Sequence, residues 1–351
     1  MEANQFASDK ILKHCDRIAE WQTTGVTKPI IWELDMTNVC NNKCPWCFGY
    51  AGERNTATLS YDVAIDILKQ IRNFGARAVT FTGGGEPLCN PVTLRVVQYA
   101  RDLGLDVGFI TNGLKIDWVT ADILVNACTW VRVSLDAGDA KTHEWMHGVS
   151  SSAFDKVING ITELVKAEKR NGATCTIGVG YLTCNQSLHS MEAATKLCKR
   201  LGVSYIQFRP RMQQYVGQAL DYDSNQLRIR SLLDKCQSYG TRDFNVLCSK
   251  HKYECIETNI VRKYPVCYGH NFAGVICADQ KVYLCCHFRG VDDFCFGDLR
   301  EFPLAALWTM SFRKDAIARI DLAQCPPLCR CDGMNEILYA AARLRTHANF
   351  L

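Results

Sequence analysis

Apolar positions up to about residue 208 follow two spacings that alternate along the chain. Short apolar runs of strand length are each followed by a longer segment with apolar residues at helical spacing. The expected strands are residues 30–36, 78–82, 107–111, 130–135, 175–182 and 205–208. The expected helices are residues 8–22, 59–74, 92–103, 120–127, 154–169 and 188–201. This alternation predicts an α/β fold with a parallel sheet.

The chain beyond these elements is less regular. We expect an N-terminal helix in 1–29, a barrel in 30–212, a polar bridging segment in 213–265, a cysteine-rich domain in 266–335 and a C-terminal helix in 336–351. The cysteine-rich part contains an expected hairpin, with strands at 274–277 and 282–285. In parallel barrels the C-terminal ends of the strands share one face, so residues that follow the strands should form one site.

The composition narrows the class of protein. Of the 351 residues, 48% are hydrophobic and 22% are charged, as in ordinary globular proteins. The net charge of +4 gives no strong argument for a nucleic-acid partner. No apolar run has the length of a membrane span or forms a signal core, so we expect a cytoplasmic protein without a membrane partner. The 20 cysteines then favour metal binding or catalysis over disulfides.

Three of these cysteines, Cys40, Cys44 and Cys47, lie within eight residues after the first strand. Iron–sulfur clusters are usually held by four Cys thiolates, so three ligands leave one iron open to a second molecule. Zinc is the alternative, but structural zinc usually takes two separated Cys-x-x-Cys pairs. The spacing therefore favours a catalytic iron–sulfur cluster on these three thiols.

Other strand endings carry candidate binding residues. Gly84 and Gly85 let the backbone approach a ligand, Pro87 fixes the turn, and Glu86 is expected to face the site. Ser134 and Asp136 are two residues apart and point to the same side, where they suit ribose hydroxyls. Arg209, at the end of the sixth strand, suits a carboxylate, either of a cofactor or of a substrate.

A second group of thiols lies in the C-terminal third. Cys267 and Cys285 lie at the two ends of the expected hairpin, and Cys325 and Cys329 form a later pair. Together they would make a four-thiolate site, for which an iron–sulfur cluster and zinc are both candidates. Cys286 and Cys331 compete for the roles of Cys285 and Cys329.

These motifs resemble the radical S-adenosylmethionine (SAM) superfamily. Its cysteine loop reads Cys-x3-Cys-x-aromatic-Cys, with Trp46 in the aromatic position here. Its Gly-Gly-Glu-Pro motif, matched by residues 84–87, meets the SAM amino group. The resemblance implies a partial (β/α)6 TIM-like barrel, with Ser134 at the SAM ribose and Arg209 at the SAM carboxylate. It also implies a flavodoxin or ferredoxin as the electron donor.

The cysteine-rich end resembles the twitch and SPASM extensions of that superfamily, which hold an auxiliary [4Fe–4S] cluster. The usual turn glycine is Gln280 here. Only three cysteines follow residue 300, which favours one auxiliary cluster, as in the twitch arrangement.

The resemblance implies an oxidoreductase or epimerase that cleaves SAM reductively to a 5′-deoxyadenosyl radical and takes a hydrogen atom from its substrate. About thirty residues precede the first strand, too few for a separate peptide-binding domain, which favours a small polar substrate such as a sugar or aminocyclitol, with net oxidation. The first alternative is a ribosomally made peptide, either crosslinked through a thioether or carbon–carbon bond or epimerised, with Cys184 as a candidate hydrogen donor. The other is a non-catalytic iron–sulfur or zinc scaffold.

Overall fold

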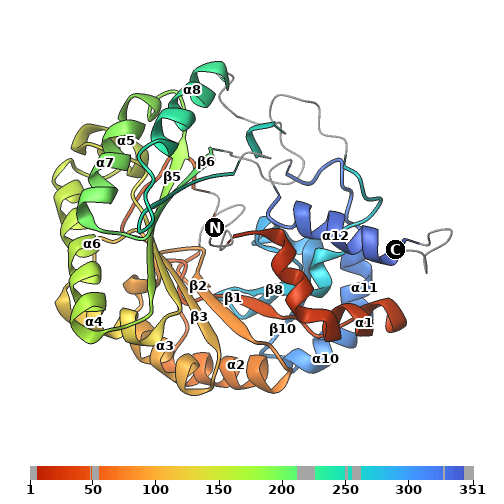
Figure 1. The fold of residues 1–351 in the computed structure, drawn as a ribbon. Helices are drawn as coiled ribbons and strands as arrows, with labels where there is room; N and C mark the ends of the chain where they lie inside the picture. The colour runs from red at the N-terminus through yellow and green to blue at the C-terminus, as the bar shows by residue number, and fades with distance from the viewer. Residues whose placement is uncertain are drawn as a thin grey trace.

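One curved sheet runs through the whole molecule (Figure 1). The computed structural model describes residues 6–47, 49, 55–211, 226–249, 252–254, 262–326 and 329–343. The order of strands in the sheet is β10-β9-β8-β1-β2-β3-β4-β5-β6-β7. The parallel strands of the barrel are β1 (Ile31–Asp35), β2 (Ala78–Thr82), β3 (Asp106–Thr111), β4 (Trp130–Ser134), β5 (Thr176–Thr183), β6 (Tyr205–Pro210) and β7 (Asn245–Cys248).

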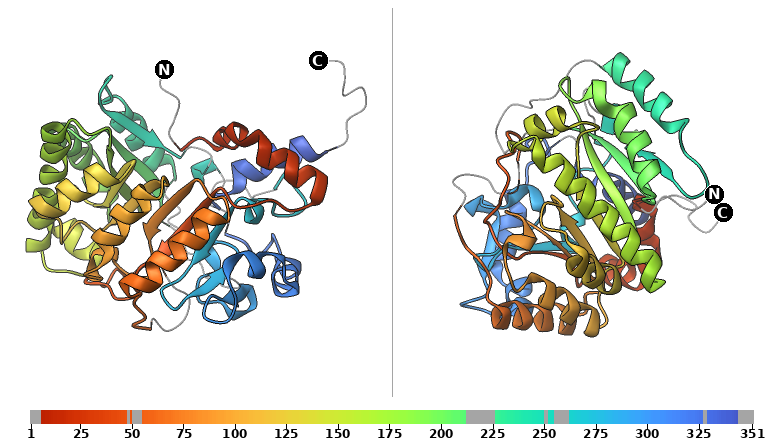
Figure 2. Two further views of the ribbon diagram at one scale, coloured as in Figure 1. Left: turned by 90° about the horizontal axis from the view of Figure 1, so that it is seen from below. Right: turned by 90° about the vertical axis from the view of Figure 1, so that its left-hand side faces the viewer.

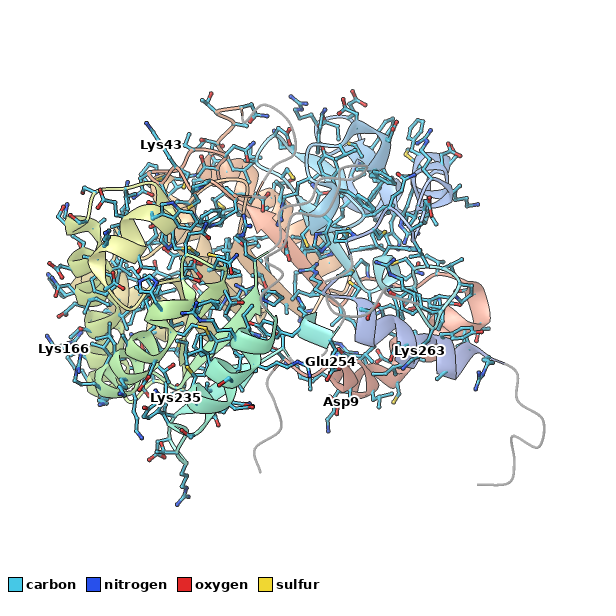
Figure 3. All side chains as sticks on the ribbon, turned by 90° about the horizontal axis from the view of Figure 1, so that it is seen from above. Asp9, Lys43, Lys166, Lys235, Glu254 and Lys263 are labelled. Carbon is cyan, nitrogen blue, oxygen red and sulfur yellow. The ribbon has the colours of Figure 1, made fainter. Side chains whose placement is uncertain are left out.

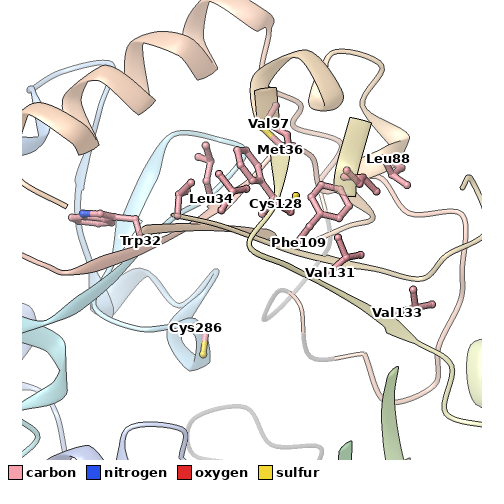
Figure 4. Close-up of a cluster of buried hydrophobic side chains, with 14 of the residues drawn as sticks. Trp32, Leu34, Met36, Leu88, Val97, Phe109, Cys128, Val131, Val133 and Cys286 are labelled. Atoms are coloured by element: carbon pink, nitrogen blue, oxygen red, sulfur yellow. The ribbon is translucent and has the colours of Figure 1, made fainter. Parts of the chain in front are cut away.

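Helices cover the outer face of this barrel in both views of Figure 2. They are α2 (Tyr61–Asn73), α3 (Thr93–Asp102), α4 (Trp118–Ala127), α5 (Ala140–His147), α6 (Ser152–Asn171), α7 (Met191–Leu201) and α8 (Gln226–Gln237). Alternate strand residues such as Leu34, Phe109 and Val131 point outward and are fully buried beneath the helices (Figure 4). The intervening residues face the lumen, so the lumen is where the polar strand residues gather.

The C-terminal part continues the same sheet. β8 (Ala273–Ile276) pairs in parallel with β1, and β9 (Lys281–Tyr283) and β10 (Cys295–Asp298) follow in antiparallel order. The helices α10 (Leu304–Thr309), α11 (Ser311–Ala318) and α12 (Asp332–Ala342) belong to this part. Gln280 occupies the turn between β8 and β9 with φ of 65°, the left-handed conformation that favours glycine.

The N-terminal helices lie against the C-terminal one. The 3₁₀ helix η1 (Ser8–His14) and the helix α1 (Cys15–Thr24) form a small apolar cluster with Leu338 of α12 and with Phe272, which precedes β8. Figure 1 shows α1 and α12 side by side. None of the described helices has the length and apolar content that a bilayer crossing requires.

The partial barrel predicted from the sequence is confirmed, as are its six strands, the helices between them and the later hairpin. Several elements were not predicted, among them β7, β10 and α5. The signal for α5 was present in its caps: Asp139 accepts a hydrogen bond from the N–H of Thr142 at 2.9 Å, and Gly148 ends the helix at φ of 59°. Of the predicted bridging segment and C-terminal helix, residues 213–225, 250–251, 255–261 and 344–351 lie outside the described part.

Candidate active site

The loop that carries Cys40, Cys44 and Cys47, residues 40–47, follows β1 and lies against the end of α5. The N–H of Lys43 donates to the carbonyl of His147 at 3.0 Å. Burial raises the pKa of Cys44 to about 12, and the charges of Cys47, Asp136 and Cys40 add to the shift. The three thiols are therefore close enough to repel one another as thiolates, and a cationic metal centre would relieve that repulsion. Lys43 itself projects outward at the edge of the molecule (Figure 3).

His147 connects this thiol loop to the end of β4. Its Nδ1 lies 3.5 Å from the sulfur of Cys44 and 3.3 Å from the amide nitrogen of Asn42. Its Nε2 lies 3.1 Å from the carbonyl oxygen of Leu135 and 3.4 Å from Oδ2 of Asp136. Because a carbonyl can only accept, Nε2 carries a proton. Sequence reasoning missed this histidine because it missed α5.

Trp46 fills the space beneath the thiol loop. Its ring is buried, with its centroid 4.2 Å from that of Trp145 and 5.0 Å from the guanidinium carbon of Arg211. It packs in a small apolar cluster with Met146 and Cys184. The thiol of Cys184 is fully buried and lies 3.7 Å from the sulfur of Met146. The thiol of Cys184 therefore faces this apolar side-chain cluster. That position does not favour its assignment as a hydrogen donor to the substrate.

The glycine motif after β2 packs directly on the chain leading into the thiol loop. The N–H groups of Gly85 and Glu86 donate to the carbonyls of Thr37 and Val39 at 2.9 and 3.0 Å. A β-carbon at Gly85 would overlap the backbone of Val39, and one at Gly84 would overlap the side chain of Asn38. Glycine is thus required at both positions by the close approach of two strand endings.

Glu86 connects the endings of β2 and β3. Its carboxylate accepts hydrogen bonds from the hydroxyl of Thr111 at 2.7 Å and from the N–H groups of Asn112 at 2.7 Å and Leu88 at 3.1 Å. The last bond caps the short 3₁₀ helix that begins at Pro87. Burial raises the pKa of Glu86, and the three donors oppose the shift. The predicted contact with a SAM amino group would add to this network.

Asp136 has a left-handed backbone, with φ of 54°, directly after β4. Its Oδ1 accepts from the N–H of Leu182 at 2.6 Å, and its Oδ2 faces His147. Burial raises its pKa, against the opposing charge of His147 and the bond from Leu182. The side chain is therefore committed to holding β4, β5 and α5 together. Ser134, half-buried at the end of β4, stands beside Gly180 in register.

Arg209 lies on the lumen side of β6. Its guanidinium makes no hydrogen bond or ion pair with any residue in the described part of the chain, and its Nε is shielded from solvent. Burial lowers its pKa to about 10, and the charge of Arg132 on β4 contributes. An unpaired guanidinium in this position is suited to an anionic ligand.

The second group of thiols lines one cavity in the C-terminal part. Five thiols surround it, together with two imidazoles: Cys267, Cys285, Cys325, Cys329, Cys331, His270 and His287. Burial raises the pKa of Cys267 to about 12 and that of Cys285 well above its usual range. Cys286 is not among the lining residues, and Figure 4 shows it apart from the other labelled side chains. Of the two adjacent thiols, Cys285 is the one that faces the cavity.

Among the described residues, no three His, Cys, Asp or Glu side chains converge closely enough to hold one metal ion. A four-iron cluster takes one thiolate at each iron, so its ligand sulfurs stand further apart than those of a single ion. The thiol-lined cavity has the donor type that such a cluster takes.

Buried ion pairs attach this cavity to β1. Nε of Arg289 donates to Oδ2 of Asp35 at 2.9 Å, and Arg289 also pairs with Glu33. Arg330, between two cavity thiols in the sequence, pairs with the same Glu33. β1 therefore leads into the thiol loop at its end and holds the second cavity through its lumen-facing carboxylates.

Comparison with known proteins identifies the domain that carries the thiol loop. Residues 34–197 match the family model described as the Radical SAM superfamily. The chain contains a radical SAM domain. Its thiol loop and glycine motif therefore belong to a domain that uses a [4Fe–4S] cluster and SAM, and its cysteine-rich end fits the auxiliary-cluster extensions found in such enzymes.

Two curated relatives match less than half of the chain. The mycofactocin maturase MftC of Mycobacterium ulcerans is 31% identical over 139 residues, which are 39% of this chain and 37% of that protein. A probable GTP 3′,8-cyclase of Saccharolobus islandicus is 31% identical over 174 residues, 49% of this chain and 54% of that protein. The chain thus spans about half, or less, of the length of these relatives.

Solved structures share the fold over nearly the whole chain. Streptococcus suis SuiB, bound to its precursor peptide SuiA, has a TM-score of 0.69 at 16% identity and covers 95% of this chain, which covers 77% of SuiB. The structure of anSMEcpe with bound AdoMet and a Cp18Cys peptide has a TM-score of 0.59 at 18% identity, over 90% of this chain and 94% of that one. At these identities the likeness establishes the fold.

Proposed function

We propose that this radical SAM protein modifies a ribosomally made peptide by hydrogen-atom abstraction with net oxidation. The observation that carries the proposal is the pair of thiol sites attached to one strand. β1 ends in the three-thiol loop, and its carboxylates Glu33 and Asp35 hold the arginines beside the second thiol cavity. Such an arrangement suits an oxidation in which one centre starts the reaction and the other receives an electron.

The comparisons favour a peptide over the sugar or aminocyclitol expected from the sequence. One curated relative is a maturase, and two structural neighbours contain bound peptides. The expectation of a small substrate depended on the short segment before β1. The shortness of that segment is no argument against a peptide substrate, because a separate partner can present the peptide to the lumen.

The thiol loop fits the ligand set of a cluster with an open iron. Cys40, Cys44 and Cys47 would hold it, and their mutual repulsion is relieved by a metal centre. Gly84 and Gly85 bring the backbone of the second strand ending against this loop, where a bound SAM would meet it. When bound, the cluster and SAM supply the hydrogen-atom abstraction.

Residues around the loop fix its position. His147 holds the loop through its ring contact with Asn42 and through its own carbonyl, which accepts from the N–H of Lys43. Asp136 orients the imidazole from the other side. Glu86 fixes the glycine motif relative to β3. We propose Ser134 as the ribose contact and Arg209 as a partner for a carboxylate. His147, Asp136 and Glu86 are held in place by hydrogen bonds before a ligand arrives, which reduces the reorganisation needed during reaction.

We assign the second cavity to an auxiliary [4Fe–4S] cluster. Cys267, Cys285, Cys325 and Cys329 are the proposed ligands, with Cys331 as the competing thiol at the same cavity. Its proposed role is to accept an electron from the substrate. Zinc on the same thiols is the alternative, and metal analysis distinguishes the two.

The test uses anaerobically reconstituted protein with SAM and dithionite. We expect chromatography to detect 5′-deoxyadenosine, and we expect a peptide encoded beside the gene to lose two hydrogens, as read by mass spectrometry. A variant with Cys40, Cys44 and Cys47 replaced by Ala is the matched control. If SAM is cleaved and none of the neighbouring peptides changes mass, the peptide assignment is wrong while the family stands.

A nucleotide is the second candidate substrate. A probable GTP 3′,8-cyclase among the relatives matches 49% of this chain. Incubation with GTP under the same conditions tests this candidate directly, because a cyclised product would appear without any peptide.

A further inference from the structure

The lumen wall formed by β4, β5 and β6 carries positive charge without matching negative charge. Arg132 of β4 and Arg209 of β6 approach the same point above Gly180 of β5. A β-carbon placed at Gly180 would lie 3.4 Å from Nη2 of Arg209 and 3.8 Å from Nε of Arg132. Two guanidinium groups in such proximity repel each other unless an anion lies between them.

Neither arginine has a carboxylate partner among the described residues. Arg132 donates one hydrogen bond, from Nη1 to the amide oxygen of Gln207 at 3.2 Å. The Nε atoms of both arginines are shielded from solvent without any partner. The hydroxyl of Tyr205, only 1% exposed, is also unpartnered and lies within electrostatic reach of both arginines. Buried donors without acceptors are rare in native proteins and indicate a missing ligand.

A third cation adds to this positive charge. Lys252, just after β7, lies within electrostatic reach of Arg209, Arg132 and two C-terminal thiols, Cys329 and Cys286. Its position follows from its neighbour Tyr253, whose hydroxyl lies 3.0 Å from that of Thr183 at the end of β5. Burial lowers the pKa of Lys252 to about 8. The three cations are thus close enough to influence one another, and Lys252 also senses two of the C-terminal thiols.

The nearby negative groups do not account for this charge. Asp136 is already committed to Leu182 and His147. SAM brings a single carboxylate, which can neutralise at most one of the three cations. The two thiols near Lys252 can balance that cation as thiolates, which leaves one of the two guanidinium groups without an anion even when SAM is bound.

We propose that Arg132, Arg209 and Lys252 bind a carboxylate of the substrate, from an acidic side chain or the C-terminus of the peptide. This inference rests on the proposed function and specifies its substrate class. A carboxylate bound by two guanidinium groups would hold the adjoining residue between the two thiol sites. Selection for an acidic residue follows, because a neutral analogue would leave the guanidinium donors unpaired.

The experiment measures binding by calorimetry to the reconstituted protein with saturating SAM, so that SAM's own carboxylate is already in place. The probes are N-acetyl-glutamyl amide, N-acetyl-glutaminyl amide and GTP. For the wild type we expect the glutamyl probe to bind about ten-fold or more tightly than the glutaminyl probe. The double variant R132M/R209M should lose that preference. Arg101→Met, at an exposed arginine on α3, is the matched control and should keep it.

Three outcomes would overturn the inference. The first is no preference for the glutamyl probe in the wild type. The second is a double variant that loses affinity for SAM but keeps the preference, which would assign both arginines to the cofactor. The third is binding of GTP without binding of the acidic probe, which would assign the cations to phosphate. Normal circular dichroism and iron content of the double variant are conditions of the test. SAM cleavage, measured separately, shows whether the proposed function fails instead.

Discussion

The imidazole Nδ1 of His147 lies 3.5 Å from the sulfur of Cys44. The two residues come from different strand endings, since Cys44 follows β1 and His147 ends the helix after β4. The contact ties the thiol loop to Asp136, which lies on the far side of the ring. A series of side-chain contacts from Cys44 through His147 to Asp136 therefore fixes the geometry of the thiol loop.

Replacing Cys40, Cys44 and Cys47 with Ala should abolish 5′-deoxyadenosine formation. If the C-terminal thiols hold a four-iron cluster, the variant should keep about four irons per chain where the wild type has about eight. Iron analysis and chromatography measure both effects. SAM cleavage by the triple variant would contradict the assignment of the loop.

Glu86→Gln should lower both the free energy of unfolding and the affinity for SAM, without loss of iron. An amide cannot accept all three hydrogen bonds, because its NH₂ group would face the N–H of Asn112 or Leu88. We expect a loss of about 1–3 kcal/mol in unfolding free energy. Denaturant titration and calorimetry with SAM are the measurements.

Thr111→Val is the control for that variant. It removes the 2.7 Å hydrogen bond to Glu86 and the 3.0 Å bond that the Thr111 hydroxyl accepts from the N–H of Gly113, but it keeps the carboxylate. It should cost about 1–3 kcal/mol of stability and leave SAM affinity unchanged. Equal losses of SAM affinity in the two variants would show that Glu86 acts only through the fold.

Replacing Cys267 and Cys329 together should leave SAM cleavage in place and lower turnover of the true substrate. The double variant should contain about four irons fewer per chain than the wild type, because two of the four cluster ligands are missing. The cavity also joins the hairpin to the late cysteine segment, so normal circular dichroism must be verified first. A wild type with about four irons and bound zinc would instead indicate a structural zinc site.

Much of the fold could be predicted from the sequence because its periodic segments are long and alternate regularly. The thiol loop and the glycine motif at the strand endings could also be predicted, because the spacing of their residues is local in the sequence. What could not be predicted is how β8 joins β1, which is a pairing between residues far apart in the chain. Local spacing contains no information about such partners.

The same limit applies to the site. His147 was missed because α5 has no clean apolar periodicity, although its caps at Asp139 and Gly148 are recognisable. Arg132 was missed because an arginine in a short strand gives no sign of facing the lumen. Glu86 was expected to face the site, and the three protein donors around it come from residues that only the folded chain brings together.

Gln280→Gly should raise the free energy of unfolding by about 1 kcal/mol, because Gln280 is held at φ of 65° where glycine carries no steric cost. The gain is reduced by the greater freedom that glycine has in the unfolded chain. Gln280→Val should lower stability, because a β-branched side chain fits this conformation poorly. Denaturant unfolding of both variants measures the difference, and a destabilised glycine variant would contradict the argument.

Arg289→Met should destabilise the protein by about 3–5 kcal/mol at neutral pH. It removes the partner of Asp35, a fully buried carboxylate, and one of the two partners of Glu33. Burial already raises the pKa of Asp35, and Arg289 is the main opposing influence. Without the arginine that pKa rises further.

The sign of the pH dependence follows from that shift. A carboxyl whose folded pKa is raised binds its proton more tightly in the folded chain, so its contribution to stability is present at low pH and is lost as the pH rises through the folded value. We therefore expect the unfolding free energy of Arg289→Met to fall more steeply than that of the wild type as the pH increases from about 4. Adding Asp35→Asn should remove most of the additional slope and recover part of the stability, because no charge is then left buried. Equal slopes for the wild type and Arg289→Met, measured by urea unfolding at several pH values, would show that Asp35 is neutral in both and that the ion pair does not hold β1 to the second thiol cavity.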